Sequence, residues 1–75
     1  MAARIEINAS VIQGKPVVRN PRIPVELLLR KLAEGATFDE LLDAYPRLVK
    51  EDIQACLAYA ADAIADEESY SLSSE

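Results

Sequence analysis

Residues 14–25 constrain the fold of this chain more than any other stretch: Gly-Lys-Pro-Val-Val-Arg-Asn-Pro-Arg-Ile-Pro-Val. They contain three of the four prolines of the chain. A proline fixes its own φ, removes an amide donor and disfavours helix in the residue before it. The stretch is therefore predicted to be rigid and extended, with Pro24 in the first turn of the helix that follows. Its basic side chains, Lys15, Arg19 and Arg22, form a candidate site for a protein partner or a phosphate.

The spacing of apolar residues on either side of this stretch predicts a mainly α fold. Residues 4–7 alternate polar and apolar side chains, and residues 16–19 contain two valines. A short N-terminal β-ribbon is therefore expected over about residues 4–19. Apolar residues recur at helical spacing in three later segments, which predict helices over about residues 24–34, 37–45 and 50–66.

Local signals mark the ends of these predicted helices. Gly35 is expected to end the first helix in a left-handed conformation. Thr37 and Glu40 have the spacing of a capping box for the second helix, and Pro46 stops it. Val49, before the third helix, has no side-chain acceptor for a cap, which costs roughly 0.5–2 kcal/mol relative to Ser or Thr. The predicted inward faces carry, helix by helix, Val25, Leu28, Leu29, Leu32 and Ala33; Phe38, Leu41, Leu42 and Tyr45; and Ile53, Leu57, Ala60 and Ile64.

The composition favours one small domain that another polypeptide completes. A chain of 75 residues buries a modest share of its surface, yet 51% of these residues are hydrophobic. One cysteine and no histidine exclude a disulfide and make a zinc site unexpected, and Cys56 is expected to be a packing residue. We expect a single domain over residues 1–66, a disordered tail over residues 67–75, and a homodimer or an obligate partner.

The charge is divided between the two parts of the chain. Residues 1–31 carry six basic and two acidic side chains, whereas residues 32–75 carry two basic and eleven acidic ones, so the net charge is −5. The acidic part argues against tight, unaided binding of nucleic acid, and the basic part leaves an anionic partner open. No apolar run is long enough to span a membrane and no signal segment is present, so a cytoplasmic location is expected. No nucleophile–base pair or phosphate loop is visible, so no enzymatic activity and no cofactor or metal are expected.

Several short motifs together resemble one known family. They are Gly14–Arg19, Arg22–Val25, Glu34–Ala36, Asp43–Pro46 and Glu51–Ile53 followed by Ala58–Ala60. In this order and spacing they resemble the domain of unknown function 433 family over roughly residues 5–62. The resemblance implies a short β-ribbon and a three-helix, helix-turn-helix-like core. It also implies a small prokaryotic antitoxin of the VapB type, which binds and silences a PIN-like ribonuclease toxin and can repress its own operon.

Two positions depart from the pattern of that family. Asn20-Pro21 stands where the family usually has Gly-Thr, which removes an amide and a hydroxyl from the loop. Val49 stands where the family favours a capping threonine, which weakens the start of the third helix.

Each candidate site has a structural alternative. Lys15, Arg19 and Arg22 either bind an anionic partner or pair within the fold with Glu6 and Glu26.

In a helix-turn-helix, Arg47 and Lys50 would contact phosphates and Gln54 would read an adenine edge. The alternative is a three-helix core whose acidic exterior, formed by Glu51, Asp52, Asp62 and Asp66, repels DNA.

The leading function is that of a dimeric antitoxin that masks a PIN-like toxin. The alternatives are a DNA-binding repressor of its operator and a free-standing dimeric interaction module.

Overall fold

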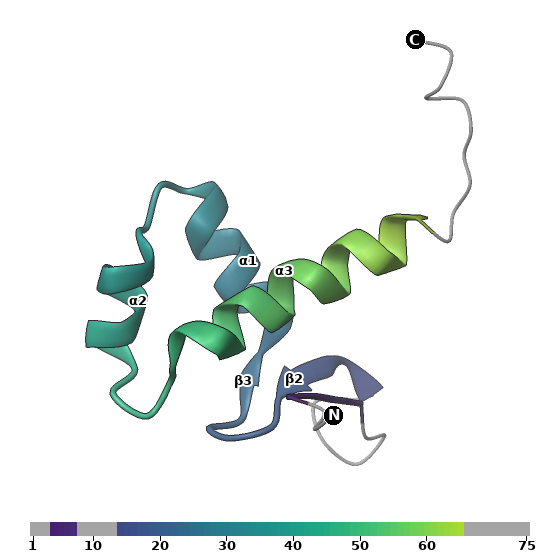
Figure 1. Cartoon of the computed structure of the whole chain (residues 1–75), viewed down its shortest axis with the longest axis horizontal. Helices are drawn as coiled ribbons and strands as arrows, with labels where there is room; N and C mark the ends of the chain where they lie inside the picture. The colour runs from purple at the N-terminus through teal and green to yellow at the C-terminus, as the bar shows by residue number, and fades with distance from the viewer. Residues whose placement is uncertain (1–3, 8–13, 66–75) are drawn as a thin grey trace, which may run out of the picture.

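The computed structural model describes residues 4–7 and 14–65, and in this part of the chain it shows a small antiparallel sheet and three helices (Figure 1). The predicted mainly helical architecture with an N-terminal β element is confirmed. The predicted tail over residues 67–75 lies outside the described residues. The elements are β1 (Ile5–Ile7), β2 (Pro16–Val18), β3 (Ile23–Pro24), α1 (Val25–Ala33), α2 (Phe38–Ala44) and α3 (Lys50–Ala65).

The sheet contains a third strand that the sequence pattern did not predict. The strand order is β1-β2-β3, and both neighbouring pairs are antiparallel. Val17 of the central strand faces Pro24, and Val18 faces Ile23. This pairing holds Pro24 in extended backbone, with φ −58° and ψ 133°. The prediction that Pro24 lies in the first helical turn is therefore wrong: it is the last residue of β3, and α1 begins at Val25.

Local hydrogen bonds close the helix ends. In the capping box of α2, the amide of Glu40 donates to Thr37 Oγ1 at 3.0 Å, and the amide of Thr37 donates to Glu40 Oε1 at 2.9 Å. At the end of α1, the amide of Gly35 donates to the carbonyl of Leu32 and that of Ala36 donates to the carbonyl of Lys31, each at 3.0 Å. This pair of bonds is the Schellman arrangement, and Gly35 has the positive φ that it needs, +105°.

Replacing Gly35 with alanine should lower the free energy of unfolding by about 1 kcal/mol, measured by urea denaturation. A Cβ atom added at Gly35 meets no atom within 4 Å, so the loss comes from the positive φ and not from a clash. Glu34→Ala is the control, because Glu34 has an ordinary φ of −87°. A Gly35→Ala protein as stable as its parent would contradict this account.

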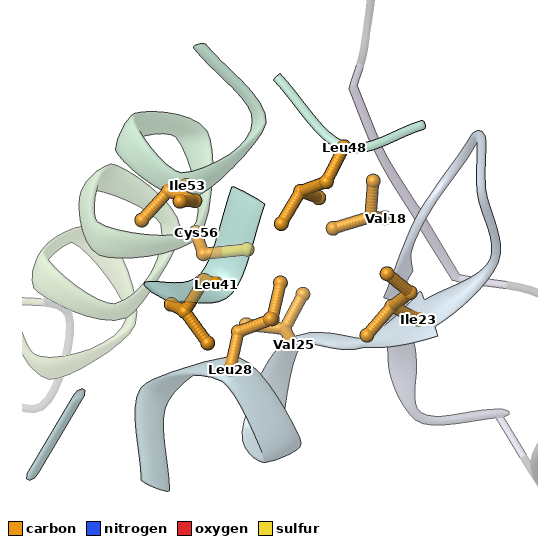
Figure 2. Close-up of a cluster of buried hydrophobic side chains, with 8 residues drawn as sticks. All are labelled: Val18, Ile23, Val25, Leu28, Leu41, Leu48, Ile53 and Cys56. Atoms are coloured by element: carbon orange, nitrogen blue, oxygen red, sulfur yellow. The ribbon is translucent and has the colours of Figure 1, made fainter. Parts of the chain in front are cut away.

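The core lies where the sheet and the three helices meet (Figure 2). It includes the predicted inward residues Val25, Leu28, Leu41 and Ile53. Cys56, expected to pack, is fully buried. The buried cluster is Val18, Ile23, Val25, Leu28, Leu41, Leu48, Ile53 and Cys56.

The predicted inward face of α3 is wrong in part. Leu57 is 42% exposed and Ile64 is 68% exposed, whereas Asp52, Ile53 and Cys56 are buried. The core contacts a strip of α3 that lies to one side of the predicted strip, and the C-terminal half of α3 extends past the other elements (Figure 1). Ala33, at the edge of the predicted α1 strip, is exposed as well. None of the described helices is both long and apolar enough to cross a membrane.

Candidate partner-binding surface

The turn between β2 and β3 lies against the connection between α2 and α3, and an apolar hollow forms where they meet. The hollow has a volume of about 240 Å³. Pro21 of the turn and Ile23 of β3 line one side, and the other side comes from the end of α2 and the residues after it. The complete lining is Pro21, Ile23, Ala44, Tyr45, Pro46 and Arg47.

The chain after α2 is held so that Pro46 and Arg47 stay at the surface. The amide of Tyr45 donates to the carbonyl of Leu41 at 2.9 Å, and the amide of Leu48 donates to the carbonyl of Tyr45 at 2.9 Å. The side chain of Leu48 is 3% exposed and anchors the connection in the core. Because Leu48 points inward, the residues just before it are left exposed and form one wall of the hollow.

The hollow has positive charge at its border. Arg47 lines it, and Arg19 and Arg22 lie in the same turn as Pro21, residues 19–22. Arg22 makes a loose ion pair with Glu6, at 3.5 Å between Nη2 and Oε2. Within the described residues, Arg19 and Arg47 are exposed and make no ion pair. An apolar hollow with an exposed arginine in its wall, and two more arginines in the adjoining turn, suits an apolar group that is followed or flanked by carboxylates.

Lys15 does not join this cluster. It precedes β2, whereas Arg19 follows the other end of that strand. Lys15 Nζ lies 3.5 Å from Glu26 Oε1, and Arg30 Nη2 lies 2.8 Å from Glu26 Oε2. The hydrogen bond from Arg30 and the charge of Lys15 lower the pKa of Glu26. The alternative in which the basic residues pair within the fold therefore holds for two of them: Lys15 pairs with Glu26, and Arg22 pairs with Glu6.

The comparisons with known proteins place this chain in a family. A family model described as "Protein of unknown function (DUF433)" matches residues 5–60. The chain belongs to the DUF433 family. This confirms the resemblance that the motifs indicated.

Two proteins of similar sequence are longer than this chain. A crystal structure of a DUF433 member protein from Anabaena variabilis has a TM-score of 0.74 and 39% identity, over 79% of this chain and 58% of that one. The uncharacterized protein y4eO of Sinorhizobium fredii (strain NBRC 101917 / NGR234) is 36% identical over 61 residues. That match covers 79% of this chain, which spans only 28% of the length of y4eO.

The three predicted DNA contacts of this DUF433 chain are all exposed. Arg47 lines the hollow, whereas Lys50 and Gln54 lie one turn apart on α3. Glu51 and Asp62 are also exposed on α3, as the acidic alternative requires. Among the described residues, no three acidic, cysteine or histidine side chains lie close enough together to hold a metal ion.

The prediction that Asp52 belongs to an acidic exterior is wrong, because Asp52 is buried, with 3% of its surface exposed. Its Oδ2 accepts a hydrogen bond from the amide of Val49 at 3.1 Å, and its Oδ1 accepts one from Arg4 Nη1 at 2.9 Å. Asp52 thus makes at Val49 the bond that a glutamate makes in a capping box. The spacing of three residues between Val49 and Asp52 is the sequence feature from which this hydrogen bond could have been predicted. Nothing in the sequence predicts the hydrogen bond from Arg4 to Asp52, because the two residues are 48 positions apart.

Proposed function

We propose that this DUF433 chain is a regulatory protein that works by binding another polypeptide, and that it acts as a homodimer. The partner we propose is a PIN-like ribonuclease toxin, which the chain neutralises as an antitoxin by stoichiometric masking. The observation that carries this proposal is the apolar hollow with Arg47 in its wall and Arg19 and Arg22 in the adjoining turn. The family resemblance is what suggests the nuclease as the partner.

The mechanism follows from the chemistry of this surface. An apolar side chain of the partner fills the hollow and removes Pro21, Tyr45 and Pro46 from water, which supplies a non-directional gain in free energy. Carboxylates at the entrance of an acidic nuclease site then pair with Arg19 and Arg47, which have no ion pair within the described residues. Guanidinium groups bind carboxylates with two parallel hydrogen bonds, so the contact is directional as well as electrostatic. With the entrance to its active site occupied in this way, the nuclease can no longer bind RNA.

The test is co-purification with the product of the adjacent reading frame, followed by titration of its ribonuclease activity. We expect a complex at micromolar concentration and complete inhibition at a fixed molar ratio. The double variant Arg19→Glu/Arg47→Glu should bind about 100-fold more weakly, because each reversal replaces an attraction by a repulsion. Lys31→Glu, the same charge reversal on α1, should stay within about threefold of the parent.

Other outcomes of this experiment decide between the alternatives. A DNA-binding repressor is favoured by the exposed Lys50 and Gln54 in the first turns of α3 and by the exposed Arg47, three residues before that helix. It predicts binding to operator DNA that weakens steeply with salt and is lost on reversal of Arg19 and Arg22. Operator binding without a nuclease complex would replace the antitoxin proposal by the repressor. A chain that binds neither would be a free-standing interaction module.

A further inference from the structure

The lining of the hollow favours one kind of side chain. Two proline rings and one aromatic ring, those of Pro21, Pro46 and Tyr45, form its apolar surface, and Arg47 supplies a positive charge. An aromatic ring packs well on another ring, and a guanidinium group attracts both an aromatic face and a carboxylate. With about 240 Å³, the hollow is smaller than pockets for drug-sized ligands, which have roughly 300–1,000 Å³. It therefore suits a single aromatic side chain that has a carboxylate close by.

The chain itself contains such a group in its acidic segment, residues 66–75, which lies beyond the described part of the structure. The acidic segment carries four acidic side chains and no basic one. Tyr70 is the one aromatic residue in it, and Glu68 precedes Tyr70 by two positions. The other aromatic residues of the chain pack against the core. In extended backbone, residues two positions apart lie on the same face, so Glu68 can pair with an arginine while Tyr70 fills a hollow beside it.

The length of α3 prevents Tyr70 from reaching the hollow of its own copy. The hollow lies near the start of α3, because Arg47 precedes that helix by three residues. Helix α3 has 16 residues and is therefore about 24 Å long. From Ala65, at the other end of α3, five residues of extended chain to Tyr70 span at most about 18 Å. The C-terminal half of α3 also projects past the sheet and the other helices, away from the hollow (Figure 1).

We infer that this chain forms a symmetric dimer in which the acidic segment of each copy binds the hollow of the other. Tyr70 packs against Tyr45 in the hollow, and Glu68 pairs with Arg47. Once one contact has formed, the second is intramolecular and forms at a high effective concentration, which favours a closed pair. The segment also competes with the nuclease for the hollow, a consequence that rests on the proposed function. One contact can hold the pair while the nuclease occupies the other hollow.

Sedimentation equilibrium of the full chain tests the contact. The parent should show a reversible monomer–dimer equilibrium, and Tyr70→Ala should weaken dimerisation at least about 30-fold, because the change occurs at both contacts. Ser73→Ala, in the same segment, is the matched control and should stay within about threefold of the parent. Circular dichroism checks that both variants keep their helix content. A parent that stays monomeric up to millimolar concentration would overturn the inference, and so would a Tyr70→Ala protein that dimerises like the parent.

A mixture of two charge-reversed variants tests whether Glu68 and Arg47 meet and whether they belong to different copies. Arg47→Glu alone brings two carboxylates together, and Glu68→Arg alone brings two guanidinium groups together, so neither variant should dimerise where the parent does. In the mixture, the acidic segment of each variant meets a hollow of opposite charge on the other. Dimers should therefore form within about tenfold of the parent affinity. If the mixture stays monomeric, or if each variant dimerises alone, the assigned contact is wrong.

Binding of the nuclease separates this inference from the proposed function. Tyr70→Ala leaves Arg19 and Arg47 in place and removes a competitor, so it should bind the nuclease at least as tightly as the parent does. A chain that dimerises through Tyr70 but binds no nuclease would refute the proposed function and support this inference. A chain that binds the nuclease through Arg47 but stays monomeric alone would refute this inference and leave the proposed masking intact.

Discussion

Replacing Asp52 with alanine is expected to lower the free energy of unfolding by about 2–3 kcal/mol, measured by urea denaturation. The side chain of Asp52 is 4% exposed and is held by Arg4 at 2.9 Å and by the amide of Val49 at 3.1 Å. Its removal leaves the amide of Val49 without its acceptor and disconnects the start of α3 from the residue that precedes β1. A domain of this size rarely has more than about 5 kcal/mol of stability, so roughly half of it would be lost.

Three further variants separate the contributions to this loss. Glu51→Ala removes an exposed carboxylate from the same helical turn and should change stability by less than about 0.5 kcal/mol. Asp52→Asn keeps an oxygen that can accept the hydrogen bond from the amide of Val49, so its free energy of unfolding should fall by about half as much as in Asp52→Ala. The loss of free energy of unfolding in Arg4→Ala should lie between those of Glu51→Ala and Asp52→Ala. The Arg4 side chain is 45% exposed, and the Asp52 carboxylate keeps its hydrogen bond from the amide of Val49. The account fails if Asp52→Ala is no less stable than Glu51→Ala.

The thiol of Cys56 is expected to react with a disulfide reagent at pH 8 about 100-fold more slowly in the folded protein than in the urea-unfolded chain. Burial and, to a smaller extent, the charge of Asp52 raise the pKa of Cys56 from 9.0 to about 11. The thiolate is the reactive form, and two pKa units lower its fraction about 100-fold at this pH. Since the thiol is also fully buried, limited access of the reagent slows the reaction of the folded protein further, so about 100-fold is the smallest difference expected.

The raised pKa of Cys56 makes the free energy of unfolding depend on pH in the alkaline range. Between pH 9 and pH 11 the unfolded thiol loses its proton while the folded thiol keeps it, so the unfolded state binds fewer protons and the free energy of unfolding falls. The fall approaches about 2–3 kcal/mol at pH 11 and is absent below about pH 8. The measurement is the difference between the parent and Cys56→Ala across this range, because both proteins share the titration of their tyrosines and lysines. Parallel curves for the two proteins would contradict the raised pKa.

The candidate surface shows how far site residues follow from sequence. The exposed basic turn with Arg19 and Arg22 was predicted, because prolines on either side leave such residues few other conformations. The hollow was not predicted, since Pro21 and Tyr45 are 24 positions apart and neither signals the other. Arg47 was assigned to DNA from its place before a helix, and the structure adds that it lines the hollow. Lys15 was grouped with the arginines by closeness in sequence, but a strand lies between them.

The sequence alone determined the start of α2 and the end of α1 in this DUF433 chain, through the capping box of Thr37 and Glu40 and the glycine bend at Gly35. These features depend on hydrogen bonds between residues at most five positions apart, so the residues that make them stand together in the sequence and can be recognised there. Only the tertiary structure decided the strand β3, the burial of Asp52 and the side of α3 that faces the core. Each of these is set by contacts between distant segments, such as Arg4 with Asp52 across 48 positions, and apolar spacing does not distinguish two adjacent strips on one helix.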